Sequence, residues 1–355
     1  MTSNNFWTNK RVLITGCTGF KGSWITIWLD MLGADLYGYS LEAPTNPSMW
    51  EDMSLERLHH EVMYADIRDY VKLQSFVDKV KPEIVIHMAA QPLVRYSYIY
   101  PRETYEVNVM GTVNLLDAVR EVGGVKSLVN VTTDKCYENK EWIWAYRENE
   151  PMGGHDPYSN SKGCSELVIS SYVNSFFQQE DTTAIASARA GNVIGGGDWA
   201  EDRLIPDIVR SFSKLEQVRI RYPDAIRPWQ HVLEPLSGYL MLAEKLYTNQ
   251  HQYVGGWNFG PLDTDTKTVK QIVEQMCSLW GNNASWVRDG NDNPHEANLL
   301  RLDCSKARMV LGWIPVWNSE ITLEQLTIWY KAYFEKQNML ELSRTQINQY
   351  MKDLV

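Results

Sequence analysis

The feature that most constrains the fold is the alternation of short apolar runs with helical patterns in the first half of the chain. Residues 11–15 (RVLIT) form an apolar run that ends at glycines, which is typical of a buried strand. Residues 21–32 follow with helical spacing, and Gly33 is suited to end that helix. Strands separated by crossover helices predict a mostly parallel sheet of the doubly wound, or Rossmann, α/β class.

This alternation weakens after about Gly195. Further strands are predicted over residues 36–41, 83–88, 127–132 and 183–188, and helices over 69–80, 104–122, 158–178, 235–247, 269–280 and 323–335. We expect a Rossmann domain over residues 1–190. A smaller lobe, mainly over residues 191–355, is expected to bind substrate at the carboxyl edge of the sheet. A segment near residues 232–247 is expected to pack back on the first domain.

Composition excludes several classes of function. The formal net charge of −10 disfavours sequence-independent nucleic-acid binding, which needs clustered Lys and Arg. The five cysteines are scattered without a CxxC pair, so we expect neither disulfides nor structural zinc, and a reducing cytoplasm. The seven histidines show no metal-ligand spacing, so no metal is expected. No apolar run reaches the roughly 18 residues of a membrane span, and no signal peptide is expected.

A glycine-rich turn follows the first predicted strand. Residues 15–23 read TGCTGFKGS, with Gly16, Gly19 and Gly22 between a strand and a helix. Backbone without a β-carbon can approach a pyrophosphate closely, and a helix N-terminus offers free N–H groups. The turn therefore predicts a dinucleotide site. The second strand ends without an Arg, which favours NAD over NADP.

A Tyr-Lys pair stands four residues apart at the start of a long predicted helix. Tyr158 and Lys162, in PYSNSK, share one helix face. A nearby ammonium is expected to lower the tyrosine pKa from about 10, so that Tyr158 can take a hydroxyl proton while hydride leaves the same carbon. Thr132 and Thr133 end the strand between the glycine turn and this pair. Together these features predict hydride chemistry.

The motifs TGxxGxxG, DIRD, HMAAQ, NVMGT, PYSNSK and RAGNVIGGGDW resemble the extended short-chain dehydrogenase/reductase family over nearly the whole chain. More narrowly, TGCTGFKGSW, APTNPSMWE and TTDKCYEN resemble the CDP-glucose 4,6-dehydratases. That resemblance implies a CDP-sugar substrate, NAD, and conversion of CDP-D-glucose to CDP-4-keto-6-deoxy-D-glucose with loss of water. The product would serve bacterial deoxysugar and lipopolysaccharide synthesis. It also implies a homodimer or higher homo-oligomer, built through the helices over residues 104–122 and 158–178.

The resemblance also assigns binding residues. It implies cofactor contacts at Gly16, Thr18, Gly19, Phe20, Lys21, Gly22, Ser40, Asp66, Ile67, Ala89, Ala90, Gln91, Asn108, Thr132, Tyr158 and Lys162. Within that set, Asp66 and Ile67 would hold the adenine, and residues 89–91 would line the nicotinamide side. Candidate substrate residues are Asn192, Arg203, Arg219, Arg227 and Arg301. Arg suits bidentate contact with phosphate oxygens. Glu296 and Asp303 are expected to be structural.

The catalytic set implied by the resemblance is Thr133, Asp134, Lys135, Tyr158 and Lys162. Thr132 or Thr133 would hydrogen-bond the sugar hydroxyl beside Tyr158. Asp134 must be protonated to act as an acid, and Lys135 must be neutral to act as a base. Both conditions require a desolvated site. Alternatively, Lys135 stays charged and stabilises an enolate. The sequence leaves both roles open.

Two other functions compete with this hypothesis. A nucleotide-sugar 4-epimerase of the same family needs Tyr, Lys and the neighbouring Thr, but no acid for carbon 6. A non-catalytic NAD-binding regulator could use the same fold without any turnover.

Overall fold

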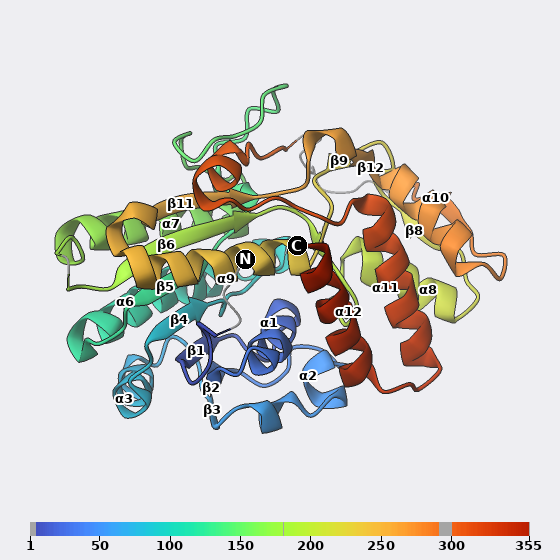
Figure 1. The fold of residues 1–355 in the computed structure, drawn as a ribbon. Coiled ribbons are helices and arrows are strands. Elements are labelled where there is room, and N and C mark those ends of the chain that lie inside the picture. The colour runs from blue at the N-terminus through green and yellow to red at the C-terminus, as the bar shows by residue number, and fades with distance from the viewer. Residues whose placement is uncertain (1–4, 180, 291–299, 355) are drawn as a thin grey trace.

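A seven-stranded parallel sheet forms the centre of the molecule (Figure 1) in a computed structural model that describes residues 5–179, 181–290 and 300–354. The strand order is β11-β6-β5-β4-β1-β2-β3. The bounds are β1 (Arg11–Thr15), β2 (Asp35–Ser40), β3 (Glu61–Tyr64), β4 (Ile84–His87), β5 (Ser127–Val131), β6 (Ala184–Ala190) and β11 (Gly255–Phe259). Each neighbouring pair is parallel. This order confirms the prediction of a doubly wound Rossmann sheet.

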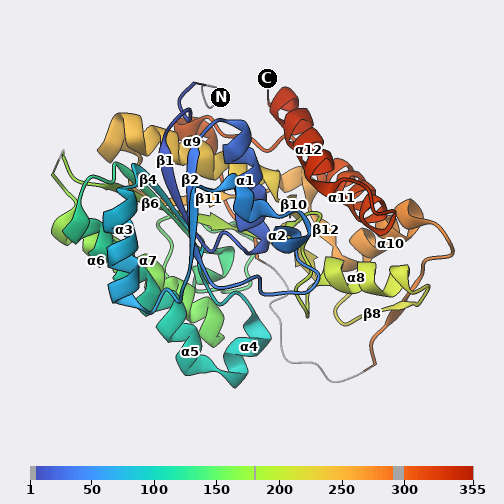
Figure 2. The same cartoon turned by 90° about the horizontal axis from the view of Figure 1, so that it is seen from below.

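Helices cover both faces of the sheet (Figures 1 and 2). One face carries α3 (Tyr70–Val80), α6 (Gly111–Val122) and α7 (Pro157–Phe176), and the other carries α1 (Phe20–Met31) and α9 (Leu233–Asn249). Side chains of β1 alternate between the two resulting cores. Val12 and Ile14 join the core under α1 and α9, whereas Leu13 joins the core under α3 and α6. A strand buried on both faces explains the unbroken apolar run in the sequence.

The remaining elements lie around the carboxyl edge of the sheet and at one end of the molecule. They include α2 (Met49–Asp52), α4 (Val94–Ile99), α5 (Pro101–Tyr105), a π-helical segment (Glu106–Met110), α8 (Leu204–Ser213), α10 (Val269–Trp280), α11 (Ser319–Phe334) and α12 (Met339–Asp353). Three two-stranded sheets pair β7 (Val193–Ile194) with β10 (Gln230–His231), β9 (Ile226–Arg227) with β12 (Lys267–Thr268), and β8 (Val218–Ile220) with β13 (Trp286–Arg288). No helix in the described ranges is both long and apolar enough to cross a membrane.

Most predicted elements occur within a few residues of their predicted bounds. The helix predicted over 104–122 instead comprises part of α5, the π-helical segment and α6. β11, α8 and α12 were not predicted. The chain beyond residue 190 supplies both β11 and α9, which packs on β5 and β6. The division of the chain at residue 190 stays a proposal.

Glu234, in the first turn of α9, joins the sheet-covering helix to the C-terminal helices. Its carboxylate accepts hydrogen bonds from the backbone N–H of Val316 at 3.1 Å and of Trp317 at 2.6 Å. The hydroxyl of Tyr350, on α12, donates to the same carboxylate at 2.7 Å. Burial raises the pKa of Glu234 to about 7. The protonated form is therefore favoured in the folded protein up to that pH.

This shift predicts that stability falls as pH rises. An unfolded Glu loses its proton near pH 4.3, whereas folded Glu234 keeps it to about 7. Between these values the folded state binds more protons, so the free energy of unfolding decreases with pH, by up to about 3.5 kcal/mol. We expect Glu234→Gln to remove this part of the slope in urea unfolding between pH 5 and 8. The exposed Glu320→Gln should keep it, and equal slopes in all three proteins would contradict the assignment.

Candidate active site

The glycine turn has the shape of a pyrophosphate cradle. A β-carbon on Gly16 would lie 2.7 Å from the Ala89 nitrogen, and one on Gly22 would lie 2.2 Å from the Gly16 oxygen, so packing requires both glycines. A β-carbon on Gly19 would meet only the Gly16 oxygen, at 3.5 Å. Helix α1 begins directly after Gly19 with no side-chain cap, which leaves first-turn N–H groups available to an anion. These groups fit a dinucleotide.

The ends of β2 and β3 form the next part of this surface. The hydroxyls of Thr18 and Ser40 lie 2.8 Å apart, and Thr18 also donates to the Leu41 carbonyl at 2.9 Å. Asp66 pairs with Arg68 at 2.6 Å, and this hydrogen-bonded guanidinium lowers the pKa of Asp66. Ile67, the next candidate, is buried. Asp66 is therefore a charged carboxylate at the sheet edge.

Asn108, in the π-helical segment, connects the loop after β4 to α7. Its side-chain oxygen accepts the Gln91 N–H at 2.8 Å, and its amide donates to the Gln91 carbonyl at 3.1 Å and to the Ser161 hydroxyl at 2.8 Å. The Gln91 side chain donates to Thr104 at 2.9 Å. Asn108 is buried, and its amide group is engaged by protein partners, so it braces the loop of Ala89, Ala90 and Gln91.

Tyr158 and Lys162 lie one turn apart at the start of α7, where the Asp156 side chain caps the helix by accepting the Ser159 N–H at 2.9 Å. The Lys162 ammonium donates to the Val131 carbonyl at 3.2 Å, and burial lowers the pKa of Lys162 to about 8. The expectation that the lysine lowers the pKa of Tyr158 is wrong in direction. Burial raises the pKa of Tyr158 to about 12, and Arg203 is the cation that opposes this rise.

The two threonines at the end of β5 point to different partners. Thr132 donates to the carboxylate of Glu166, which also accepts two hydrogen bonds from Arg189, at 2.9 and 2.8 Å. Thr133 instead hydrogen-bonds Tyr158 and donates to the Asp134 carboxylate at 3.0 Å. Of the two residues, Thr133 is therefore the one that contacts Tyr158. Glu166 and Arg189 were not predicted, although Glu166 follows Lys162 at helical spacing.

Asp134 and Lys135 lie in a 3₁₀ turn, Asp134–Cys136, directly after β5. Asp134 is buried, and burial raises the pKa of its carboxyl, against the charges of Lys135, Arg227 and Lys21. Its Oδ2 atom has no hydrogen-bond partner among the described residues. A raised pKa is the shift that a carboxyl group needs to act as an acid. Lys135 is partly exposed beside it.

Lys21 extends from the first turn of α1 to the same cluster. Its ammonium lies 3.4 Å from the hydroxyl of Tyr239, a buried residue of α9. Burial lowers the pKa of Lys21 to about 7, the charges of Arg203 and Lys162 lower it further, and Asp134 opposes them. The sequence predicted Lys21 only as a cofactor residue. In the structure it also belongs to the charged groups around Asp134. Phe20, beside it, is partly buried.

The candidate substrate residues separate into two groups. Arg203 pairs with Asp198 at 3.1 Å, and its charge opposes the rise in the pKa of Tyr158. The charge of Arg227 opposes the rise in the pKa of Asp134 in the same way. Asn192 follows β6, and its carbonyl accepts the Gln230 N–H at 3.0 Å. In contrast, Arg219 is exposed on β8, and Arg301 pairs with Asp263 at 2.7 Å. The described contacts do not bring Arg219 or Arg301 to the cluster around Tyr158. Glu296 lies outside the described residues.

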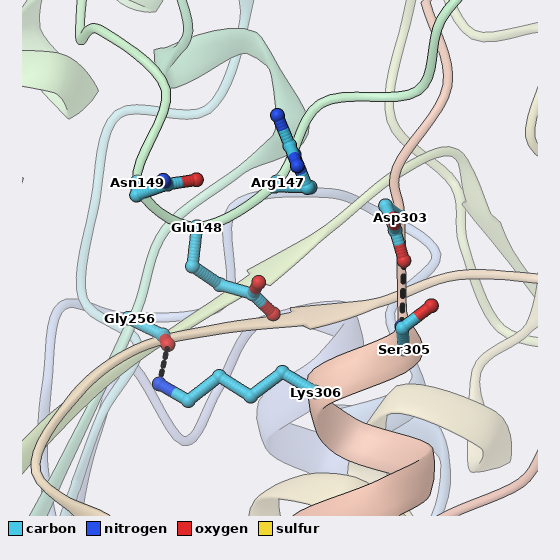
Figure 3. A pocket seen from close by; sticks show the side chains of 7 residues that line it. All are labelled: Arg147, Glu148, Asn149, Gly256, Asp303, Ser305 and Lys306. Carbon is cyan, nitrogen blue, oxygen red and sulfur yellow. Dashed lines mark hydrogen bonds between the residues drawn. The ribbon is translucent and has the colours of Figure 1, made fainter.

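A separate hollow of about 480 Å³ lies between residues 147–149, β11 and the segment 303–306 (Figure 3). Its charged groups already have partners. The Lys306 ammonium donates to the Gly256 carbonyl at 2.7 Å and lies 4.1 Å from the Trp257 ring centroid. Asp303 accepts the Ser305 N–H at 2.7 Å, in agreement with a structural role for Asp303. The group of residues suited to hydride and acid–base chemistry is therefore the cluster around Tyr158.

Known proteins resemble this chain in sequence and in fold. Residues 13–326 match the sequence family described as GDP-mannose 4,6 dehydratase. CDP-glucose 4,6-dehydratase of Salmonella typhimurium is 58% identical over 355 residues, which cover 99% of each chain. GDP-mannose 4,6 dehydratase of Drosophila melanogaster is 24% identical, over 86% of this chain and 82% of its own.

Two solved structures share the fold at low sequence identity. UDP-glucose 4-epimerase of Thermotoga maritima, with UDP-glucose, superposes with a TM-score of 0.80 at 22% identity, covering 91% of this chain and 99% of its own. A dTDP-glucose 4,6-dehydratase of Streptomyces venezuelae, with NAD bound, has a TM-score of 0.77 at 22% identity, covering 93% and 99%. The sequence matches identify the group more narrowly than the fold does: the chain belongs to the GDP-mannose 4,6 dehydratase family and, within it, to the CDP-glucose 4,6-dehydratases.

Proposed function

We propose that the protein converts CDP-D-glucose to CDP-4-keto-6-deoxy-D-glucose and water, a hydro-lyase reaction with NAD as cofactor. The observation that carries this proposal is the buried acid Asp134, hydrogen-bonded to Thr133 beside Tyr158. Dehydration needs such an acid next to the oxidising tyrosine, whereas epimerisation does not. The 58% identity to a CDP-glucose 4,6-dehydratase supports the same reaction and the same sugar nucleotide.

The residues around the glycine turn bind the cofactor in this proposal. N–H groups at the start of α1 hold the pyrophosphate, next to Gly19, and Asp66 and Ile67 hold the adenine. Bound NAD supplies the hydride acceptor for carbon 4 and the hydride donor for carbon 6. The backbone of the loop of residues 89–91, braced by Asn108, lines the nicotinamide side.

The catalytic residues act in sequence on carbons 4, 5 and 6 of the sugar. Tyr158 removes the proton of the carbon 4 hydroxyl, and the charge of Arg203 favours its phenolate. Lys162, one turn further along α7, is the second cation of this pair in the proposal. The ketone at carbon 4 makes the carbon 5 proton acidic. Lys135 removes that proton and, after the reduction, protonates carbon 5 again. Asp134 protonates the hydroxyl that leaves carbon 6, a role that its raised pKa favours.

The substrate diphosphate is bound by Arg203 and Arg227, with Asn192 at the same edge of the sheet. Arg presents a planar fork of donors that matches phosphate oxygens. Arg219 and Arg301 stay candidates for the nucleotide end of the substrate. The epimerase and regulator alternatives are less well supported, because neither requires a buried acid at Asp134.

Measuring the loss of water from nucleotide-linked sugars tests both the proposed reaction and the specificity for the nucleobase of the substrate. Purified protein is incubated with NAD and, in separate reactions, CDP-glucose, UDP-glucose, dTDP-glucose and GDP-mannose. We expect only the CDP-glucose product to be lighter by one water in mass spectrometry. A product of unchanged mass with a new chromatographic position would support the epimerase. Bound NAD without turnover of any sugar would support the regulator.

Two variants of Lys135 separate a base from an electrostatic role. Lys135→Ala removes both functions, whereas Lys135→Arg keeps the charge on a group that cannot be deprotonated in proteins. If Lys135 is the base, both variants slow deuterium incorporation at carbon 5 in D₂O, by about 10²-fold or more. Incorporation at the wild-type rate in Lys135→Arg would assign only an electrostatic role. The wild-type rate in Lys135→Ala would exclude both roles.

We also propose that the protein is a cytoplasmic homodimer that serves lipopolysaccharide synthesis. Support for the dimer comes from the surface of α4, the π-helical segment and α7, since α4 and α5 both contact α7. This surface exposes six large apolar side chains: Tyr98, Ile99, Tyr100, Met110, Leu167 and Phe176. Clustered exposed apolar groups mark interaction sites.

A charge on this surface should weaken the dimer. Leu167, on α7, is 60% exposed, and Leu167→Glu would bury an unpaired carboxylate in the proposed interface. We expect light scattering after gel filtration to give twice the 41.0 kDa chain mass for the wild type and a shift toward one chain for the variant. Val71→Glu, at a 72% exposed position on α3, is the matched control. An unchanged mass for Leu167→Glu would exclude this face.

A further inference from the structure

Two groups in the proposed reaction change their proton count in opposite directions. Tyr158 gains the proton of the carbon 4 hydroxyl, and Asp134 gives a proton to the hydroxyl that leaves carbon 6. The carbon 5 proton is removed and returned at the same carbon, so its base ends the turnover as it began. Each turnover therefore leaves one proton too many on Tyr158 and one too few on Asp134. This imbalance has to be reversed before the next substrate reacts.

Thr133 lies between these two groups. Its hydroxyl donates to the Asp134 Oδ1 atom at 3.0 Å, and a side-chain hydrogen bond joins it to the Tyr158 phenol. A hydroxyl both donates and accepts, so it can receive one proton while it gives up another. Thr133 and Asp134 are 7% and 2% exposed, which limits exchange with bulk water. The Oδ2 atom of Asp134, without a partner among the described residues, is left for the leaving hydroxyl.

We propose that Thr133 relays a proton from Tyr158 to Asp134 in every turnover, so that the carbon 4 hydroxyl proton replaces the one that leaves in the released water. The O–H bond of Tyr158 breaks as an O–H bond to Thr133 forms. The former Thr133 O–H bond breaks as one to Asp134 forms. The result is a phenolate and a protonated carboxyl, which is the state that the next turnover needs. The relay requires no co-reactant, and it rests on the proposed function.

Burial acts on the proton affinity at both ends of the relay. Burial raises the pKa of Asp134, which favours a proton on the carboxyl. Burial also raises the pKa of Tyr158, to about 12, and the hydrogen bond with Thr133 and the charge of Arg203 oppose this rise in favour of the phenolate. Lys21, whose charge acts on Asp134, and Lys162 contribute further positive charge to the same enclosure. A buried, hydrogen-bonded chain of this kind is polarised along its length.

The simpler alternative is that Thr133 only hydrogen-bonds the sugar oxygen at carbon 4. That role would affect oxidation at carbon 4 whatever group leaves carbon 6. A relay, by contrast, matters only when the leaving group must be protonated. CDP-6-deoxy-6-fluoroglucose separates the two roles, because fluoride leaves carbon 6 without a proton from Asp134.

The test compares CDP-glucose with the fluoro analogue, using NAD-loaded wild type, Thr133→Val, Thr133→Ser and Asp134→Asn. For Thr133→Val we expect water loss to fall by about 10²-fold more than fluoride release, which is a general-acid effect. Asp134→Asn should show the same selective loss, and Thr133→Ser should restore the wild-type ratio. The relay would be overturned if Thr133→Val slowed water loss and fluoride release equally while Asp134→Asn slowed only water loss.

A second measurement covers the case in which Thr133→Val is inactive on both substrates. In mixtures of H₂O and D₂O, a relay that moves two protons together predicts a curved dependence of the wild-type rate of water loss on deuterium fraction. A linear dependence would overturn the relay. Failure of the proposed function is distinguishable from either result, because the wild type would then release neither water from CDP-glucose nor fluoride from the analogue.

Discussion

The buried ion pair between Glu166 and Arg189 is the interaction on which the geometry of the site depends. Glu166 lies one turn beyond Lys162 on α7 and accepts hydrogen bonds from Thr132, Ser187 and Arg189. These contacts connect the helix to the ends of β5 and β6. They engage the hydroxyl of Thr132, and the next residue, Thr133, is the one that contacts Tyr158. Removing one member of such a pair leaves an uncompensated buried charge, so the pair is costly to break.

Desolvation is the common cause of the electrostatic properties of the site. It raises the pKa of Asp134 and of Tyr158, and it lowers the pKa of Lys21 and of Lys162. The carboxyl of Asp134 and the ammonium groups of Lys21 and Lys162 are thereby brought closer in proton affinity, whereas the phenol of Tyr158 moves away from them. The charge of Arg203 and the hydrogen bond with Thr133 oppose the rise at Tyr158.

The sequence predicted what depends on local pattern and missed what depends on tertiary contacts. The buried strands, the glycine turn and the start of α7 were predictable, because apolar period, glycine spacing and the Tyr-Lys spacing are local signals. β11 was missed because it begins with two glycines, which disfavour strands outside a sheet context. α12 is largely polar, and it is held by distant partners such as Glu234 through Tyr350.

The same distinction applies to the candidate site. The pattern predicted that Tyr158 and Lys162 lie at the start of one helix, but it gave the wrong direction for the tyrosine pKa, because the depth of burial is not a local property. It also could not separate Thr132 from Thr133, since the choice depends on Glu166 and Arg189. The arginines were identified by residue type alone. Only the fold distinguishes Arg203 and Arg227, whose charges act on Tyr158 and Asp134, from Arg219 and Arg301.

The π-helical segment at residues 106–110 sets the rotational phase between α5 and α6. Because an α-helix turns about 100° per residue, one residue fewer in this segment would rotate everything before it by about that angle relative to α6. Asn108 would then no longer face both Gln91 and Ser161, while Met110 stays exposed on the opposite side. The wider turn of the π-helical segment therefore gives one continuous helix two different faces. Its inner face, through Asn108, braces the loop after β4, and its outer face, at Met110, is apolar and exposed.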